Sequence, residues 1–199
     1  MIKNVTVTGT ITGSTNVGAI CKTTYGDIES CVSYATITVD GQRTGGIAGL
    51  VYAGGSITNC INYGAITSTY ATSSLAPKAK EAYIGGIVGY AYVRVETCAN
   101  FGEVKATGDG ISCAGGIAGY VRVGYEAEAG SAYLLNCYNT GAVSAASKTG
   151  GIVGEAAVAV TNCYNTGAVT GGAIIGSSAT GSSMTNCYYL TGSCTDGGS

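Results

Sequence analysis

Residues 150–170 read GGIVGEAAVAVTNCYNTGAVT, and this stretch joins two motifs that recur along the chain. The first motif is Gly-Gly-Ile, then Ala or Val, then Gly, and it returns at 45–49, 85–89 and 115–119. The second motif pairs a Thr-Asn-Cys-like segment with an Ala-Val-Thr-like segment. Its copies begin at Ile2, Ile28, Ile57, Val95, Leu134, Val160 and Met184. Two linked motifs that recur together indicate a repeat protein.

One column of the second motif sets the repeat length. It is occupied by Val5, Cys31, Cys60, Cys98, Cys137, Cys163 and Cys187. Successive members lie 24 to 39 residues apart, with a basic period of 24 to 26 and two enlarged repeats. The repeats are rich in Gly, Thr, Ile, Val, Asn and Tyr, which favour strands and turns over helices. Each repeat holds three strand-like pieces, so we expect an all-β, right-handed parallel β-solenoid, a three-sided β-helix of about six coils.

Apolar residues recur in three columns, one for each expected side of the solenoid. The first column is Ile20, Ile47, Ile87, Ile117, Ile152 and Ile174; the second is Ile11, Ile37, Ile66, Val104, Val143 and Val169; the third is formed by the residues that begin the second motif. We expect all three to point inward and stack into one continuous core. A fourth column contains Asn62, Asn100, Asn139 and Asn165, each followed two residues later by Gly. We expect it to form a sharp corner, because Asn and Gly tolerate left-handed backbone, and its amides to bond along the rod.

The composition excludes several classes of protein. The chain has 199 residues, of which 34 are Gly, only 10% are charged and none is His. The 46% hydrophobic content argues against disorder, and no apolar run is long enough for a membrane helix. The net charge of −2 argues against nucleic-acid binding. Without His, every mechanism that needs a histidine base is excluded. We therefore expect a single domain over 1–199 that binds no nucleic acid and inserts in no membrane.

The two motifs together resemble the GLUG repeat, which occurs in large bacterial surface proteins such as IgA-specific metallopeptidases and adhesin-like proteins. The resemblance covers essentially the whole chain and implies an extracellular, non-catalytic module at the cell surface. No zinc-peptidase motif can be transferred, since the chain has no His. The N-terminus shows no export signal. We therefore expect the chain to be a fragment of a longer exported protein, in contact with its other domains.

The cysteines and acidic residues favour a structural interpretation. Six of the nine Cys share one column, and we expect them to be buried free thiols, since no Cys-x-x-Cys pair suggests a metal site. The sequence does not decide whether two of Cys21, Cys113 and Cys194 form a disulfide. The eleven acidic residues are dispersed, with Glu126 and Glu128 as the one close pair, which a solvated loop explains. We expect no cofactor and no metal.

Inserted loops are the strongest indication of a binding site. Four insertions fall at one corner, between the second apolar column and the next Gly-Gly pair: 40–44, 68–83, 106–113 and 144–149. A fifth, 124–131, lies at another corner. Loops on a rigid scaffold often carry recognition, although tolerated surface insertions explain them equally well. The candidate binding residues are Tyr70, Lys78, Lys80, Tyr83, Asp109, Tyr125, Glu126 and Glu128.

A ladder of Tyr138, Tyr164 and Tyr188 follows the Cys column over the last coils. We expect it to stabilise the stack, and it offers a surface for sugar or protein. The sequence thus predicts a cell-surface adhesion, binding or spacer module whose partner is a glycan or protein of a host or neighbouring cell. The alternatives are a carbohydrate-active β-helix that acts on polysaccharide, and a structural rod that forms filaments by end-to-end association.

Overall fold

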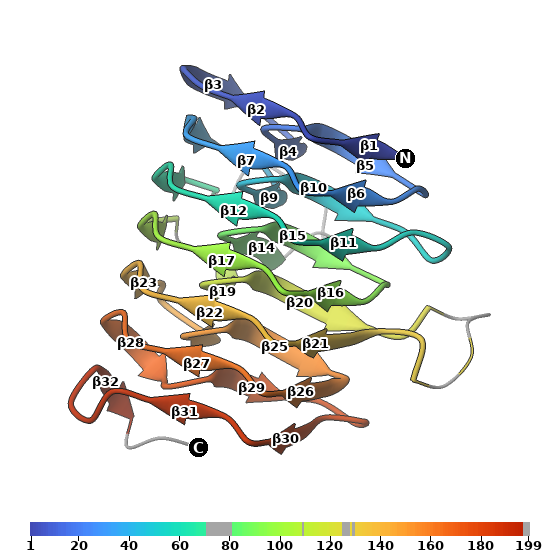
Figure 1. Cartoon of the computed structure of the whole chain (residues 1–199). Helices are drawn as coiled ribbons and strands as arrows, with labels where there is room; N and C mark the ends of the chain where they lie inside the picture. Colours follow the sequence, from blue (N-terminus) through green and yellow to red (C-terminus); the bar gives the residue numbers. More distant parts are fainter. Residues whose placement is uncertain (71–80, 109, 125–127, 129, 197–199) are drawn as a thin grey trace.

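The computed structural model describes the chain apart from residues 71–80, 109, 125–127, 129 and 197–199. The described residues form short strands that stack coil upon coil (Figure 1), and no helix among them could cross a membrane. Equivalent residues of neighbouring coils pair in parallel and in register, as Ile57 does with Val95 and Asn62 with Asn100. The predicted parallel β-solenoid is confirmed. In Figure 1 the chain crosses the front from right to left and returns behind as it descends, which is a right-handed path.

Five stacks of strands run along the solenoid. Stack one contains β1 (Ile2–Lys3), β6 (Ile28–Glu29), β11 (Ile57–Thr58), β16 (Val95–Glu96), β21 (Tyr133–Leu135), β26 (Ala159–Thr161) and β30 (Ser183–Thr185). Stack two contains β2 (Thr6–Val7), β7 (Val32–Ser33), β12 (Ile61–Asn62), β17 (Ala99–Asn100), β22 (Tyr138–Asn139), β27 (Tyr164–Asn165) and β31 (Tyr188–Tyr189). Stack three contains β3 (Thr10–Gly13), β8 (Thr36–Val39), β13 (Ile66–Ser68), β18 (Val104–Ala106), β23 (Val143–Ser144), β28 (Val169–Gly172) and β32 (Cys194–Asp196).

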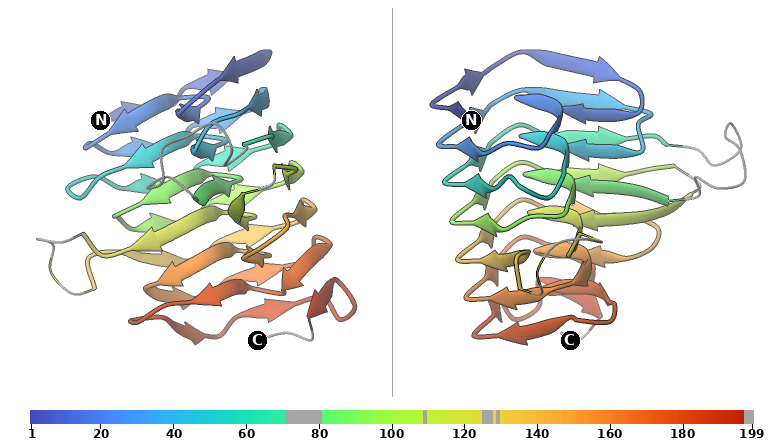
Figure 2. Two further views of the ribbon diagram at one scale, coloured as in Figure 1. Left: turned by 180° about the vertical axis from the view of Figure 1, so that it is seen from behind. Right: turned by 90° about the vertical axis from the view of Figure 1, so that its right-hand side faces the viewer.

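The remaining stacks complete each coil. Stack four contains β4 (Asn16–Gly18), β9 (Arg43–Gly45), β14 (Glu81–Gly85), β19 (Ile111–Gly115) and β24 (Thr149–Gly150), and β28 extends to pair with β24. Stack five contains β5 (Cys21–Thr24), β10 (Ala48–Val51), β15 (Val88–Ala91), β20 (Ala118–Arg122), β25 (Val153–Ala157) and β29 (Ile175–Ser178). Figure 2 shows the same coils from behind and from the side.

Two of the three expected strand pieces are each divided in two. Stacks one and two are separated by a residue in the left-handed conformation, just before the Cys column. These residues are Asn4, Ser30, Asn59, Thr97, Asn136, Asn162 and Asn186, with φ between 51° and 58°. Stacks four and five are separated by the Gly-Gly-Ile turn. The expectation that the Asn62 column supplies left-handed corner residues is therefore wrong, because the bend lies three residues earlier.

The expected apolar columns are confirmed as the core. The columns of Ile47 and Ile57 pack in one large cluster between stacks one, two and five, and the column of Ile66 packs against stack four in a second cluster. Their middle members are fully buried. Members in the terminal coils are more exposed, Met184 by 46%, because they have a neighbouring coil on one side only.

The Asn62 column lies inside the solenoid as a hydrogen-bonded ladder. Asn62, Asn100, Asn139 and Asn165 are fully buried, and the Nδ2 of each of the first three donates to the Oδ1 of the next Asn at 2.8 Å. Each Nδ2 also donates to the carbonyl oxygen two residues ahead, in its own coil. The expected bonding along the rod is confirmed, and it satisfies polar groups that would be costly to bury alone.

Candidate functional site

Most of the candidate loop residues are not brought together in the described structure. Lys78, Lys80, Asp109, Tyr125 and Glu126 lie outside the described residues. Glu128 is exposed, and its carbonyl oxygen accepts a hydrogen bond from the Ser131 amide at 3.1 Å.

Tyr70 and Tyr83 differ from the expectation of an exposed loop. Tyr70 is 4% exposed and packs in the core cluster of Ile66. Tyr83 is 9% exposed and lies within β14, which already begins at Glu81. Both aromatic rings are buried because apolar surface next to the core is removed from water, so neither presents a surface to a partner in this structure.

An exposed row of aromatic side chains runs along the outside of the solenoid. Tyr34 and Tyr63 stack with ring centroids 4.8 Å apart and planes 6° apart, and Tyr63 stacks on Phe101 at 4.8 Å. The row continues through Phe101 to Tyr138 at 5.5 Å with perpendicular rings, and Tyr138 stacks on Tyr164 at 5.2 Å. We call Tyr34, Tyr63, Phe101, Tyr138, Tyr164 and Tyr188 the aromatic row. Tyr188 is included because it pairs in register with Tyr164.

The strand alternation of stack two explains why this row faces water. The Cys and Asn columns point inward, so the residues directly after each of them point outward. Tyr34, Tyr63 and Phe101 follow the Asn column, whereas Tyr138 and Tyr164 follow the Cys column. This change of column explains the perpendicular step in the middle. Sequence reasoning found the ladder that begins at Tyr138 and missed the earlier half.

The row presents hydroxyl groups without protein partners. Within the described residues, the hydroxyls of Tyr34, Tyr63, Tyr138 and Tyr164 make no hydrogen bond, whereas Tyr83 donates one to the Glu81 carboxylate. Partial burial raises the pKa of Tyr138, so this phenol stays protonated at neutral pH. Stacking hides the ring faces, so the row offers ring edges and hydroxyls to a partner.

A second cluster of side chains lies on the outer faces of stacks four and five. Tyr83 alternates with the inward residues Ala82 and Ile84, and its ring contacts Tyr90 and Tyr120 at centroid distances of 4.9 and 5.6 Å. Burial raises the pKa of Tyr83, and the hydrogen bond to Glu81 raises it further. The rings of Tyr83 and Tyr90 are almost fully covered, so they form a small core rather than an open binding surface.

Charged groups border this small core. Lys148 Nζ lies 2.6 Å from Glu155 Oε2 and 3.4 Å from Glu81 Oε1. The buried thiol of Cys113 donates to Glu155 Oε2 at 3.6 Å, and burial raises the pKa of this thiol. Burial alone would lower the pKa of Lys148, but the hydrogen bond to Glu155 and the nearby acidic groups of Cys113, Glu155 and Glu81 together outweigh it and raise this pKa above 10.5. One ammonium therefore pairs with two carboxylates from different coils.

We expect Lys148→Met to lower the free energy of unfolding by about 1–2 kcal/mol, because it leaves the half-buried Glu155 carboxylate without its cation. The double variant Lys148→Met/Glu155→Gln should recover most of this loss. Lys3→Met, which breaks the more exposed pair with Glu29 at 2.8 Å, should cost less than about 0.5 kcal/mol. Urea unfolding measures all three, and a double variant no more stable than Lys148→Met would contradict the pairing.

The pH dependence of this contribution follows from the raised pKa of Lys148. A raised folded-state pKa stabilises the fold at all pH values below the ordinary value of 10.5. The stabilisation is lost as the pH rises through the folded-state pKa. We expect the stability difference between the wild type and Lys148→Met to be constant near neutral pH and to shrink only in strongly alkaline solution.

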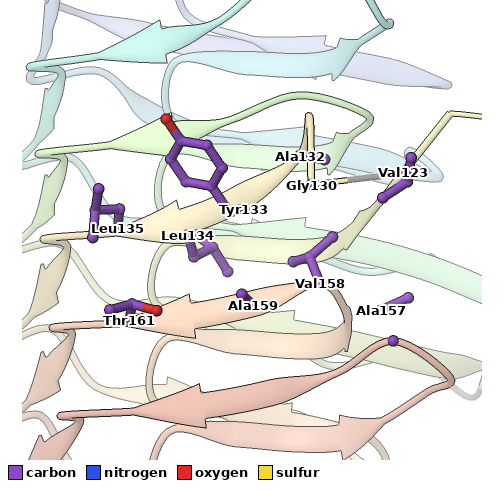
Figure 3. A pocket seen from close by; sticks show the side chains of 11 residues that line it. Val123, Gly130, Ala132, Tyr133, Leu134, Leu135, Ala157, Val158, Ala159 and Thr161 are labelled. Atoms are coloured by element: carbon purple, nitrogen blue, oxygen red, sulfur yellow. The ribbon is translucent and has the colours of Figure 1, made fainter. Parts of the chain in front are cut away.

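An apolar hollow of about 470 Å³ lies at the corner between stacks five and one. Val123, Leu134, Leu135 and Val158 line it, and Figure 3 shows them on neighbouring coils. The Tyr133 hydroxyl at its rim donates to Glu96 at 3.5 Å. Gly130 of the predicted 124–131 insertion also lines the hollow.

The Cys column is buried as expected. All nine Cys are free, and Cys31, Cys60, Cys98, Cys137 and Cys163 are buried, while Cys187 in the last coil is half-buried. Their thiols donate to carbonyl oxygens of the residue two before, at 3.2–3.4 Å. Burial raises the pKa of Cys98. These thiols behave as small core residues.

Comparison of the chain with known protein families, with curated proteins and with solved structures finds no match.

Proposed function

We propose that the chain is a non-catalytic binding and spacer module of a bacterial surface protein. The resemblance of its motifs to the GLUG repeat supports a location outside the cell. The rod holds attached domains away from the envelope and contacts a glycan or protein of a host or neighbouring cell. The single observation that carries the binding role is the aromatic row, since exposed aromatic residues on a rigid scaffold are a common basis of recognition.

The rigidity of the rod supports the spacer role. Backbone pairing in register links every coil to the next, and the Asn ladder and the core columns continue through the middle coils. In a solenoid each inner coil packs against both of its neighbours, so the coils form one continuous, extended stack.

The test of this function is a printed array of glycans and host proteins probed with the purified chain. We expect reproducible binding to at least one class and no change in the ligand. Binding to nothing on either array would contradict the binding role. Fibres seen by electron microscopy would instead favour the filament-forming rod.

Action on polysaccharide is the second candidate, and one observation favours it. Glu81 and Glu155 converge on Lys148, and a pair of carboxylates can provide general acid and base catalysis. Catalysis is therefore tested at Glu81 and Glu155 rather than at Glu126 and Glu128. Release of oligosaccharide by the pure chain, abolished in Glu155→Gln, would support an enzyme and overturn the non-catalytic proposal.

A further inference from the structure

We propose that the aromatic row binds a neutral, extended polysaccharide that lies along the rod with about one sugar per coil. This inference rests on the proposed binding function and names its ligand class. Four observations carry it: the lack of charge on this surface, its exposed hydroxyls, its small area and the spacing of its rings.

The two outward columns that contain the aromatic row carry no charge. Their members are Thr6, Val32, Ile61, Ala99, Tyr138, Tyr164 and Tyr188, followed by Thr8, Tyr34, Tyr63, Phe101, Thr140, Thr166 and Leu190. A surface without Lys or Arg has nothing to pair with a carboxylate, sulfate or phosphate. The ligand class is therefore an uncharged polymer rather than an acidic glycan, a nucleic acid or an anionic lipid.

The hydroxyl groups of the row suit a ligand that is rich in hydroxyls. Four phenols of the row make no hydrogen bond within the described residues, and the ring planes of stacked neighbours lie 6–9° apart. Because the rings cover one another's faces, a ligand meets edges and phenolic oxygens. Sugars combine C–H edges with hydroxyls that donate and accept, which matches this mixture.

The exposed area is too small for a stable contact between two copies of the chain. Four members of the row are 42–69% exposed: Tyr34 52%, Tyr63 42%, Tyr164 44% and Tyr188 69%. With a full area of about 150–250 Å² per side chain, these four offer about 300–500 Å², and the half-buried Phe101 and Tyr138 add less than that. Stable protein interfaces bury about 800 Å² per partner. A narrow polymer needs no broad flat interface, so this row suits a polymer better than a second copy of the chain.

The spacing of the rings along the row matches the repeat of a polysaccharide chain. Successive ring centroids are 4.8, 4.8, 5.5 and 5.2 Å apart from Tyr34 to Tyr164. This spacing follows from the rise between stacked strands. A β-1,4-linked chain of pyranose rings advances by a closely similar rise per sugar, so each sugar meets one ring of the row. Several weak contacts along one chain then add up to a useful affinity.

The experiment is calorimetric titration of the full chain with β-1,4-linked gluco-oligosaccharides, from disaccharide to octasaccharide. We expect affinity to rise with length and to level off near six sugars, which is the number of rings in the row. Tyr63→Ala should weaken binding of the longest ligand about tenfold, and Tyr63→Phe should weaken it less, since it keeps the ring. Tyr25→Ala is the matched control, because Tyr25 is 67% exposed and stacks on Tyr52 away from the row.

Several outcomes would overturn the proposal. These are no binding of any oligosaccharide, affinity independent of length, equal loss in Tyr25→Ala, or equal binding of polygalacturonate. A dimer in analytical ultracentrifugation that Tyr63→Ala abolishes would show that the row joins two copies instead. If the array identifies a protein ligand whose binding Tyr63→Ala leaves intact, this inference fails while the binding module stands. If the array identifies no ligand at all, the proposed function fails as well.

Discussion

Replacing Asn139 by alanine is expected to lower the free energy of unfolding by about 3–5 kcal/mol. The amide of Asn139 makes three buried hydrogen bonds. Its Nδ2 donates to the Gly141 carbonyl oxygen at 2.7 Å and to Asn165 Oδ1 at 2.8 Å, and its Oδ1 accepts from Asn100 Nδ2 at 2.8 Å. The alanine removes all three, so the buried Asn100 Nδ2 keeps only its bond to the Gly102 carbonyl oxygen, and the buried Asn165 Oδ1 keeps only the bond from the Gly167 amide. These incompletely bonded buried groups, rather than the lost bonds alone, make the effect large.

Thr140→Ala is the matched control for this prediction. Thr140 is the next residue, it is exposed, and its side chain makes no hydrogen bond within the described residues. We expect its effect to stay within about 0.5 kcal/mol. Urea unfolding followed by circular dichroism compares the two variants. A loss below about 1 kcal/mol in Asn139→Ala would show that the ladder is not a main source of stability.

The apolar columns and the Asn ladder could be predicted from the sequence because they repeat without a change of position. Each inward residue pairs with the equivalent residue of the next coil, so the alignment of motifs is also the alignment in space. The left-handed residue could not be located in this way. Its column contains Ser30 and Thr97 as well as Asn. The known preference of Asn for the left-handed conformation therefore does not mark the whole column.

The candidate sites were harder to predict for two physical reasons. The aromatic row changes column between Phe101 and Tyr138, so no single column of the alignment contains all of it. The cluster around Lys148 joins residues next to loops of different length. The motifs do not align these residues with one another, so the sequence does not show that they lie side by side. Glu81 and Lys148 are 67 residues apart, and only the stacking of β14, β19 and β24 brings them together.

Replacing Gly116 by alanine is expected to lower the free energy of unfolding by about 3 kcal/mol or more. A Cβ at this position would collide with the carbonyl oxygen of Gly151 in the next coil and would lie 2.6 Å from Asn139 Oδ1. Neither atom can move freely, because one is backbone and the other is held in the ladder. Gly26→Ala is the control, since the nearest heavy atoms to its Cβ would be 3.7 Å away, and we expect less than about 0.5 kcal/mol there.

The double variant Gly116→Ala/Asn139→Ala tests why the two motifs occur together. The second Gly of each Gly-Gly-Ile motif faces an Asn of the ladder, as Gly46 faces Asn62 and Gly86 faces Asn100. Removing the Asn139 amide leaves room for part of the new methyl group, although the clash with Gly151 remains. We therefore expect the double variant to lose at least about 1 kcal/mol less than the sum of the two single losses. Additive losses would mean that the glycine is needed only for close backbone stacking and that the two motifs are linked for another reason.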